Sequence, residues 1–263
     1  MRAFACVLAI SLTATAPVQA APLRVASLKL CTDELLMAVA DPRQIVSVTY
    51  LAQQPREYAQ WRQARAFAAN DGSLLSVVRH RPDLVIDMGG AGGRDSERIA
   101  RRLGIGVLNL RYPQNLRDME DLVMQVSRAL GREQAGRSVV ARFEQLRQSR
   151  PPRLSDALWL GGGGLTIASS GLGAEWMALA GLKQRQVAGD RVTLEQLIVA
   201  PPPILLRSDY RIDQYSSEQR WLMHPLVAKA RVARTIATDG RPWTCLGPPM
   251  IEEVRRLRTE LAR

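Results

Sequence analysis

Few residues in this chain have the types and spacing that catalysis requires. Among 263 residues there are only two histidines and three cysteines. His80 lies between two arginines, and His224 precedes a proline with no acidic residue nearby. The G-x-S-x-G, S-x-x-K and H-E-x-x-H signatures of hydrolases and metalloproteases are absent. The absence of these signatures disfavours an enzyme. Because metal sites need several converging His, Cys or carboxylate ligands, the sequence also disfavours a protein that binds bare metal ions.

Two glycine runs lie where nucleotide-binding loops would, but neither completes a signature. Residues 89–93 follow a predicted strand, yet Asp95 stands where the dinucleotide fingerprint needs its third glycine. Residues 161–164 lack the Lys-Ser/Thr pair that follows a phosphate-binding loop. We interpret both runs as tight strand-to-helix turns that let the backbone line a cleft.

Two aromatic residues lie in predicted strand-to-helix loops. Tyr50 ends one predicted strand, and Trp243 follows the last one. In a parallel sheet the carboxyl ends of the strands border the ligand crevice, where rings can stack on a flat ligand. The alternative is that both rings only fill space between loops. Trp159, Trp176 and Trp221 are interpreted as packing residues.

The elements that would position these residues alternate between strands and helices. This alternation is typical of parallel sheets with helices on both faces, and therefore of an α/β fold. Thr32 or Asp33 is a candidate N-cap of the first helix. Strands are expected at residues 23–28, 45–48, 83–88, 104–110, 157–160, 204–206 and 235–237, and helices at 32–39, 74–79, 96–103, 174–180, 193–199, 224–230 and 250–262.

Residues 117–148 form the longest predicted helical element. Their apolar positions continue along one face past Gly131 until Pro151 and Pro152, which would make a helix of about 45 Å at 1.5 Å per residue. We expect a rigid connection between two Rossmann-like lobes. The predicted organisation is an N-terminal lobe at residues 21–116, a single interlobe helix at 117–150 and a C-terminal lobe at 151–263.

The first twenty residues are typical of a signal peptide. Met1-Arg2 precedes an apolar run, and Val18 and Ala20 supply the small residues that a signal peptidase reads. We expect cleavage after Ala20 and export to the periplasm. No stretch of about eighteen apolar residues predicts a permanent membrane span.

The chain carries a net charge of +11, from 36 Lys and Arg against 25 Asp and Glu. This balance favours anionic partners. The arginines are scattered through the sequence and do not form one stripe, so we expect no binding to nucleic acid.

The order of segments resembles the periplasmic substrate-binding proteins of cobalamin and ferric-siderophore ABC importers, in which one long helix joins two lobes. The resemblance implies a monomer without catalysis or a cofactor of its own. It would capture a preassembled metal chelate between its lobes and pass it to an inner-membrane ABC permease. The segments that carry the resemblance span essentially the whole chain after residue 20: VASL at 25–28, CTDELL at 31–36, RPDLVI at 81–86, LGI at 103–105, TLEQL at 193–197, RPW at 241–243 and GP at 247–248.

Carried over residue by residue, the resemblance places the cleft in several loops. Tyr50 stands where a cobalamin-binding member has a contacting ring, and Trp243 lies on the opposite lobe. From its position at a strand end, Arg207 is either a bidentate partner for an anionic ligand group or a surface arginine. The implied cleft residues are Leu30, Cys31, Thr32, Tyr50, Leu51, Met88, Gly89, Gly90, Gly171, Leu172 and Trp243.

The resemblance implies that the protein docks on the permease through two glutamates, one on each lobe, which meet permease arginines. Glu195 matches the position in the second lobe, but Leu75 occupies the position in the first, where Asp71 is a nearby substitute. Cys31 and Cys245 both fall at cleft-facing ends of predicted elements, and we hypothesise a disulfide between them.

The ligand stays open at this point. The many arginines favour anionic iron chelates, whereas the paired aromatic residues favour a corrinoid or another flat ligand, and haem is a third candidate. A periplasmic enzyme and a signalling adaptor on the same scaffold are the alternatives to a carrier.

Overall fold

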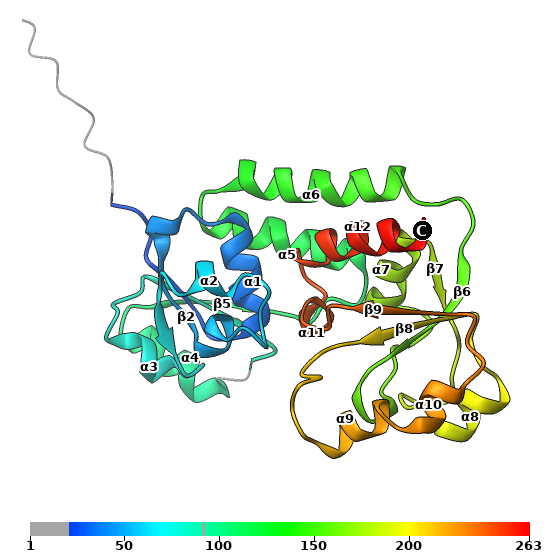
Figure 1. Ribbon diagram of the computed structural model, residues 1–263. Coiled ribbons are helices and arrows are strands. Elements are labelled where there is room, and N and C mark those ends of the chain that lie inside the picture. Colours follow the sequence, from blue (N-terminus) through cyan, green and yellow to red (C-terminus); the bar gives the residue numbers. More distant parts are fainter. Residues whose placement is uncertain (1–20, 91–92) are drawn as a thin grey trace, which may run out of the picture.

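A computed structural model describes residues 21–90 and 93–263, which form two α/β lobes (Figure 1). The expected signal peptide, residues 1–20, lies outside the described residues. In the part of the chain that the structure describes, every helix is too short or too polar to cross a membrane. The α/β class with two parallel-sheet lobes, expected from the sequence, is confirmed.

The N-terminal lobe contains a five-stranded parallel sheet in the order β3-β2-β1-β4-β5. Its first helix begins at Leu30, two residues earlier than expected, with Lys29 at the N-cap. Thr32 therefore lies inside the helix, and its hydroxyl accepts from the Lys29 N–H. The elements are β1 Val25–Ser27, α1 Leu30–Val39, η1 Pro42–Gln44, β2 Ile45–Thr49, η2 Tyr50–Gln53, α2 Trp61–Ala64, β3 Ala68–Asn70, α3 Leu74–Val78, β4 Leu84–Met88, α4 Gly93–Arg102 and β5 Gly106–Leu110.

The C-terminal lobe repeats this plan with four parallel strands in the order β7-β6-β8-β9. In both lobes, the strand-to-helix turns meet at the carboxyl edge of the sheet, as a parallel arrangement requires. The elements are β6 Ser155–Leu160, η3 Gly162–Gly164, α7 Leu172–Ala180, β7 Leu182–Gln184, α8 Leu194–Val199, β8 Ile204–Ser208, α9 Ser217–Leu222, α10 Pro225–Lys229, β9 Arg234–Thr238, α11 Pro242–Cys245 and α12 Met250–Leu261.

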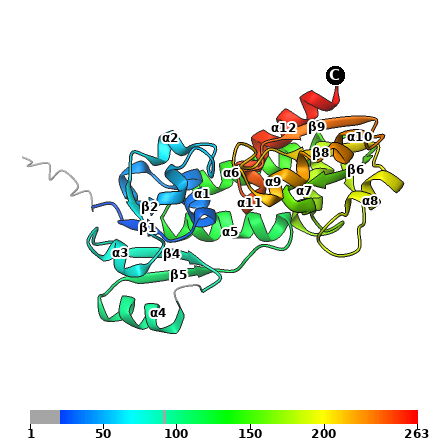
Figure 2. The ribbon, with the colours of Figure 1, turned by 60° about the horizontal axis from the view of Figure 1, so that its bottom comes forward.

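The expected single helix between the lobes is in fact two helices, α5 Leu116–Ala129 and α6 Glu133–Gln148. The chain reverses at Gly131, whose φ of 63° ends the first helix. α5 extends from one lobe to the other in Figure 2, and α6 returns along it to pack on α1 and α12. At 16 residues, α6 is about 24 Å long, roughly half of the expected strut.

The lobes are joined by packing as well as by connectivity. One cluster of buried apolar side chains runs from α1 through α5 and α6 to α7 and α12. Phe143 of α6 meets Trp176 of α7 edge to face, with ring centroids 5.4 Å apart. A disulfide joins Cys31 of α1 to Cys245 of α11, with the two Cα atoms 5.1 Å apart. The two sheets are therefore tied together close to their facing edges.

Candidate functional site

A cavity of about 470 Å³ lies at the carboxyl edge of the C-terminal sheet. The turns that follow β6, β8 and β9 form its wall, which is where parallel sheets bind ligands. Its volume is within the usual range for a small-molecule site. The lining residues are Trp159, Gly161, Gly162, Leu165, Ser208, Tyr210, Arg211, Gln214, Ser216, Glu218, Gln219, Gly240, Trp243 and Thr244.

Two tryptophan rings form an apolar wall of this cavity. Trp159 is the penultimate residue of β6 and Trp243 belongs to α11, and their ring centroids are 5.6 Å apart with the planes tilted by 42°. The Trp243 Nε1 donates to the Thr238 hydroxyl at 2.7 Å, which fixes the orientation of this indole. Trp159 and Trp243 are only 6% and 7% exposed, so the rings give the cavity a small, fixed apolar area.

Two polar atoms in the cavity wall have no hydrogen-bond partner among the described residues. These are the Nε1 of Trp159, a donor, and the Oε1 of Gln219, an acceptor. The two side chains belong to residues that are only 6% and 8% exposed. Gln219 is held in place because its Nε2 donates to the Tyr210 carbonyl at 2.8 Å. Buried polar groups are almost always paired, so these two atoms are exceptions, but each is enclosed by protein and has almost no surface exposed to the cavity.

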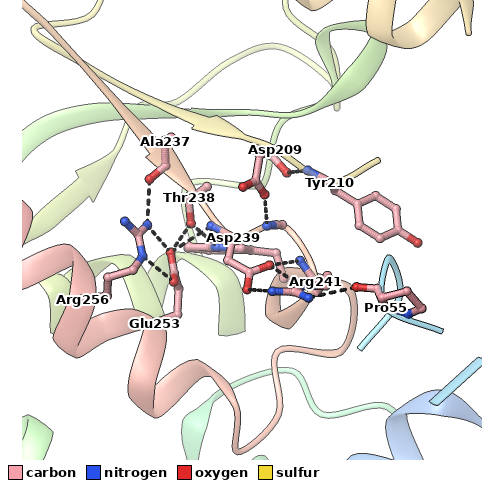
Figure 3. Close-up of polar contacts among 12 residues, drawn as sticks. Pro55, Asp209, Tyr210, Ala237, Thr238, Asp239, Arg241, Glu253 and Arg256 are labelled. Carbon is pink, nitrogen blue, oxygen red and sulfur yellow. Dashed lines mark hydrogen bonds and ion pairs between the residues drawn. The ribbon is translucent and has the colours of Figure 1, made fainter. Parts of the chain in front are cut away.

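A polar network supports the cavity from behind (Figure 3). The buried carboxylate of Glu253 on α12 accepts from the Thr238 hydroxyl and from the Asp239 N–H, and it pairs with Arg256 at 2.7 Å. Asp209 accepts from the Gly240 N–H at 2.9 Å, so the turns after β8 and β9 are joined. Since Thr238 also accepts from Trp243, this network fixes one wall of the cavity.

Tyr210 and Arg211, at one edge of the cavity, bind the N-terminal lobe. Glu57, in the loop between η2 and α2, accepts from the Tyr210 hydroxyl and from the Arg211 guanidinium, both at 2.6 Å. Burial, followed by the hydrogen bond to Glu57, raises the pKa of the Tyr210 phenol above its ordinary value. The phenol therefore stays protonated and donates.

Two further contacts cross between the lobes beside Glu57. Arg56 pairs with Asp213 at 2.6 Å. Arg241, whose guanidinium is bound by Asp239, donates to the Pro55 carbonyl at 2.9 Å (Figure 3). Three successive residues of one loop thus hold the rim of the cavity.

A larger hollow of about 610 Å³ lies elsewhere, among Asn115, Arg147, Glu175 and their neighbours. It is formed by the start of α5, the end of α6 and one side of α7, away from the strand ends. Glu175 already accepts from the Leu116 N–H at 2.7 Å. We place the candidate site in the cavity at the strand ends because its aromatic wall and unpaired buried groups suit a ligand.

Of the cleft residues expected from the resemblance, the structure places only Trp243 in the wall of this cavity. Leu30, Thr32, Met88 and Leu172 are buried, and Cys31 is in the disulfide. Thr32 bonds the hydroxyl of Ser27 at 2.7 Å. Leu51 is half-buried in η2, beside the N-terminal lobe's core.

The three expected cleft glycines lie at turns. Gly89 sits against the ring of Tyr112, so closely that a Cβ would be 2.5 Å from a ring carbon. The Gly90 N–H donates to the Asn109 side chain at 3.1 Å. Gly171 is the N-cap of α7. Residues 91 and 92, in the middle of the first glycine run, lie outside the described residues.

Tyr50 lies in a different hollow from Trp243. It is 50% exposed and shares an open hollow of about 550 Å³ with Asp71 and Leu75. The first expected ring and the first expected docking position therefore lie together on the N-terminal lobe. Leu75 is 71% exposed, an unusual position for a leucine.

Arg207 and Glu195 also have defined surroundings. Ser208 lines the cavity, so its strand neighbour Arg207 points to the other face of the sheet. The Nε of Arg207 is buried without a hydrogen bond to any described residue. Glu195 is exposed in the first turn of α8, where hydrogen bonds from its own backbone and from Thr193 lower its pKa.

Sequence reasoning missed Trp159, Tyr210, Arg211 and Gln219. Trp159 was expected only to pack, and it is buried, but it also lines the cavity. A signal for Tyr210 and Arg211 was present, since they lie four and five residues after the end of the predicted strand at 204–206. Gln219 belongs to α9, which the sequence pattern did not predict. Within residues 21–90 and 93–263, no group of three or more His, Cys, Asp or Glu side chains has the arrangement of a metal site.

No protein-family model matches the chain, and no curated protein matches its sequence. Solved structures do match. The periplasmic heme-binding protein HutB of Vibrio cholerae is 16% identical with a TM-score of 0.73, over 92% of this chain and 99% of that chain. The periplasmic vitamin B12 binding protein BtuF of Vibrio cholerae is 18% identical with a TM-score of 0.62, over 92% and 97% of the two chains.

A third similar structure is the siderophore-binding protein BauB, bound to a complex between two molecules of acinetobactin and ferric iron. It is 16% identical with a TM-score of 0.65, over 92% of this chain and 94% of that chain. At such low identities these likenesses show the fold. The chain has the two-lobed fold of the class III periplasmic binding proteins.

Proposed function

We propose that this protein is a periplasmic solute-binding protein that captures a metal chelate and delivers it to an inner-membrane ABC permease. The observation that carries the proposal is the cavity at the strand ends of the C-terminal lobe, with its two tryptophan rings and its unpaired indole N–H. Such a site binds a large, flat, partly polar ligand by surface contact. The metal would arrive inside the ligand, so the protein needs no metal ligands of its own.

The expected signal peptide and the family of folds support the same location. Export after cleavage at Ala20 would place the carrier in the periplasm, with Ala21 as its first residue. Glu195 supports docking, because its lowered pKa keeps a negative charge on an exposed helix end, where it can meet a permease arginine.

An enzyme on this scaffold has less support. Neither His80 nor His224 lines the cavity, so no imidazole base is positioned at the candidate site. A signalling adaptor would share the cavity, and only an assay of transport distinguishes it from a carrier. Haem, corrinoids and ferric siderophores all remain within the proposed ligand class.

The test is a titration of tryptophan fluorescence with cyanocobalamin, ferrichrome and hemin, corrected for ligand absorbance. We expect at least one chelate to quench saturably, with a Kd of about 1 μM or lower. The Trp243→Phe variant should lose much of the quenching. Trp61→Phe is the matched control, since Trp61 stacks with Arg62 and Arg65 and lies outside the cavity. Failure of every chelate to saturate at about 100 μM would overturn the proposal.

A further inference from the structure

We propose that Glu57 is a built-in competitor for the ligand: its carboxylate occupies an anion site formed by Tyr210 and Arg211, and a chelate that carries a carboxylate displaces it. The inference rests on the proposed function and narrows its ligand class. It follows from the geometry at the edge of the cavity, where one lobe supplies the donors and the other supplies the anion.

The anion site consists of two donors that converge on one carboxylate. The Tyr210 hydroxyl binds Oε2 of Glu57 and the Arg211 guanidinium binds Oε1, each at 2.6 Å. Arg211 also stacks over the Tyr210 ring, with its Cζ 5.1 Å from the ring centroid. The two donors are thus held side by side, and charge-assisted bonds of this kind are the strong ones.

Both donors belong to the cavity as well as to the contact between lobes. Tyr210 and Arg211 line the cavity, and Arg211 is the one cationic side chain among its described lining residues. Arg211 has a φ of 54°, a left-handed conformation that is costly for a residue with a side chain. This backbone directs a cation to the edge of the cavity, where its acidic partner comes from the other lobe.

Glu57 is positioned as a stand-in for a ligand group. It is only 7% exposed, and both of its partners, Tyr210 and Arg211, line the cavity. Exchange of one carboxylate for another keeps Arg211, whose side chain is 41% exposed, paired with an anion. Glu57 would only have to rotate toward solvent.

This exchange selects ligands by charge. Haem carries two propionate carboxylates, and ferric citrate carries carboxylates on an iron chelate, so either source supplies the anion. Cobalamin carries no carboxylate: its corrin ring bears amides, and its anionic group is the phosphodiester of its nucleotide loop. An affinity for carboxylate chelates would therefore be set by competition with Glu57, and removal of the Glu57 charge should strengthen it.

The experiment measures the binding of four probes to Glu57→Gln: hemin, hemin dimethyl ester, ferric citrate and cyanocobalamin. We expect hemin or ferric citrate to bind about tenfold more tightly than to the wild-type protein, with the ester and cyanocobalamin unchanged. Which of the two carboxylate probes responds identifies the source of the anion. Adding Arg211→Gln to Glu57→Gln should reverse the gain for that probe.

The matched control is Arg56→Gln, which removes the neighbouring pair with Asp213 between the lobes but leaves the anion site intact. Equal tightening by both variants would mean that the lobes simply loosen, and would overturn the inference. So would unchanged affinity of Glu57→Gln for both carboxylate probes, or no binding of either. If neither hemin nor ferric citrate binds but cyanocobalamin does, the proposed function stands and only this inference is wrong. If no chelate binds, both the proposed function and this inference are wrong.

Discussion

The indole N–H of Trp159 is the clearest residue-scale sign of a ligand. A buried donor without a partner costs about 1–3 kcal/mol, which a folded protein retains where function uses the group. Here the atom lies in the wall of a cavity, next to a second ring that is fixed by Thr238. The N–H is enclosed by protein, so a ligand that accepts its hydrogen bond would have to move part of the cavity wall.

Trp159→Phe tests this role, since phenylalanine keeps one six-membered aromatic ring and removes the N–H donor together with the five-membered ring that carries it. We expect the affinity for the chelate that binds best to fall about five- to tenfold, because one hydrogen bond is lost. The free energy of unfolding should fall by about 1–3 kcal/mol, because the smaller ring leaves a cavity at a buried site and the loss of the unpaired N–H offsets only part of that cost. Fluorescence titration and urea denaturation measure the two quantities. An unchanged affinity would show that the N–H does not contact the ligand.

Buried acids on α1 give the protein a pH-dependent stability. Burial raises the pKa of Asp33 to about 7, although hydrogen bonds from Thr49 and Ser27 oppose the shift. Burial, with a smaller contribution from the charge of Asp33, also raises the pKa of Glu34. The folded state therefore holds protons that the unfolded chain releases as the pH rises from about 4 to about 7. Stability must fall across this window.

We expect the free energy of unfolding, measured in urea, to fall by up to about 4 kcal/mol between pH 4 and pH 7 because of Asp33 alone. In Asp33→Asn the free energy of unfolding should fall less steeply with pH, and the decrease that is left should come from Glu34. A slope as steep in Asp33→Asn as in the wild-type protein, or a stability that rises across the window, would contradict the account.

Of the individual cleft residues expected from the sequence, only Trp243 lines the cavity. Trp243 was found because a ring after the last strand lies at the carboxyl edge of a parallel sheet. Arg207 was one residue from Ser208, which does line the cavity, and strand alternation reverses the direction of neighbouring side chains. Glu57 could not be found, because its partners Tyr210 and Arg211 are more than 150 residues away.

At the scale of elements, most of the longer strands and helices were predicted, but two three-residue strands and the break in the longest helical segment were not. β3 and β7 have three residues each, too few to show alternation. The apolar face of residues 117–148 continues through Gly131, so its pattern fits one helix as well as two. The reversal is fixed by contacts made in the folded state, among them the Gln44 side chain donating to the Leu130 carbonyl at 2.9 Å.

The disulfide between α1 and α11 is the element-scale constraint that is simplest to remove. Reduction, or the Cys31→Ser/Cys245→Ser double variant, should lower the free energy of unfolding by about 5 kcal/mol at most, since the bridge closes a loop of 214 residues. Urea denaturation with and without reductant measures the change. Alkylation of the exported protein without reductant should leave its mass unshifted, and two labelled thiols would contradict the pairing.

At the scale of the whole molecule, only one of the two expected docking positions carries an acidic residue. Glu195 is exposed on the C-terminal lobe, whereas the N-terminal lobe presents Leu75 beside Asp71. Docking would therefore be asymmetric, with an ionic contact on one lobe and an exposed apolar side chain on the other. The fold was predictable from the order of its segments, but this asymmetry depends on which surface each residue faces.

Glu195→Lys tests the docking surface. Uptake of the bound chelate by cells that also express the permease should fall at least about tenfold, because the reversed charge repels a permease arginine. Ligand affinity in solution should not change, since Glu195 lies outside the cavity. Asp121→Lys, an equal charge change at an exposed position of α5, is the control. A loss of affinity in Glu195→Lys would refute a role limited to docking.

The most direct measurement is a crystal structure of the protein with the chelate that binds best in the titrations. The account predicts the chelate against the rings of Trp159 and Trp243, with its polar edge toward Tyr210 and Arg211. A chelate in the hollow beside Tyr50, among the helix ends near Asn115, or on the outer surface of either lobe would contradict it.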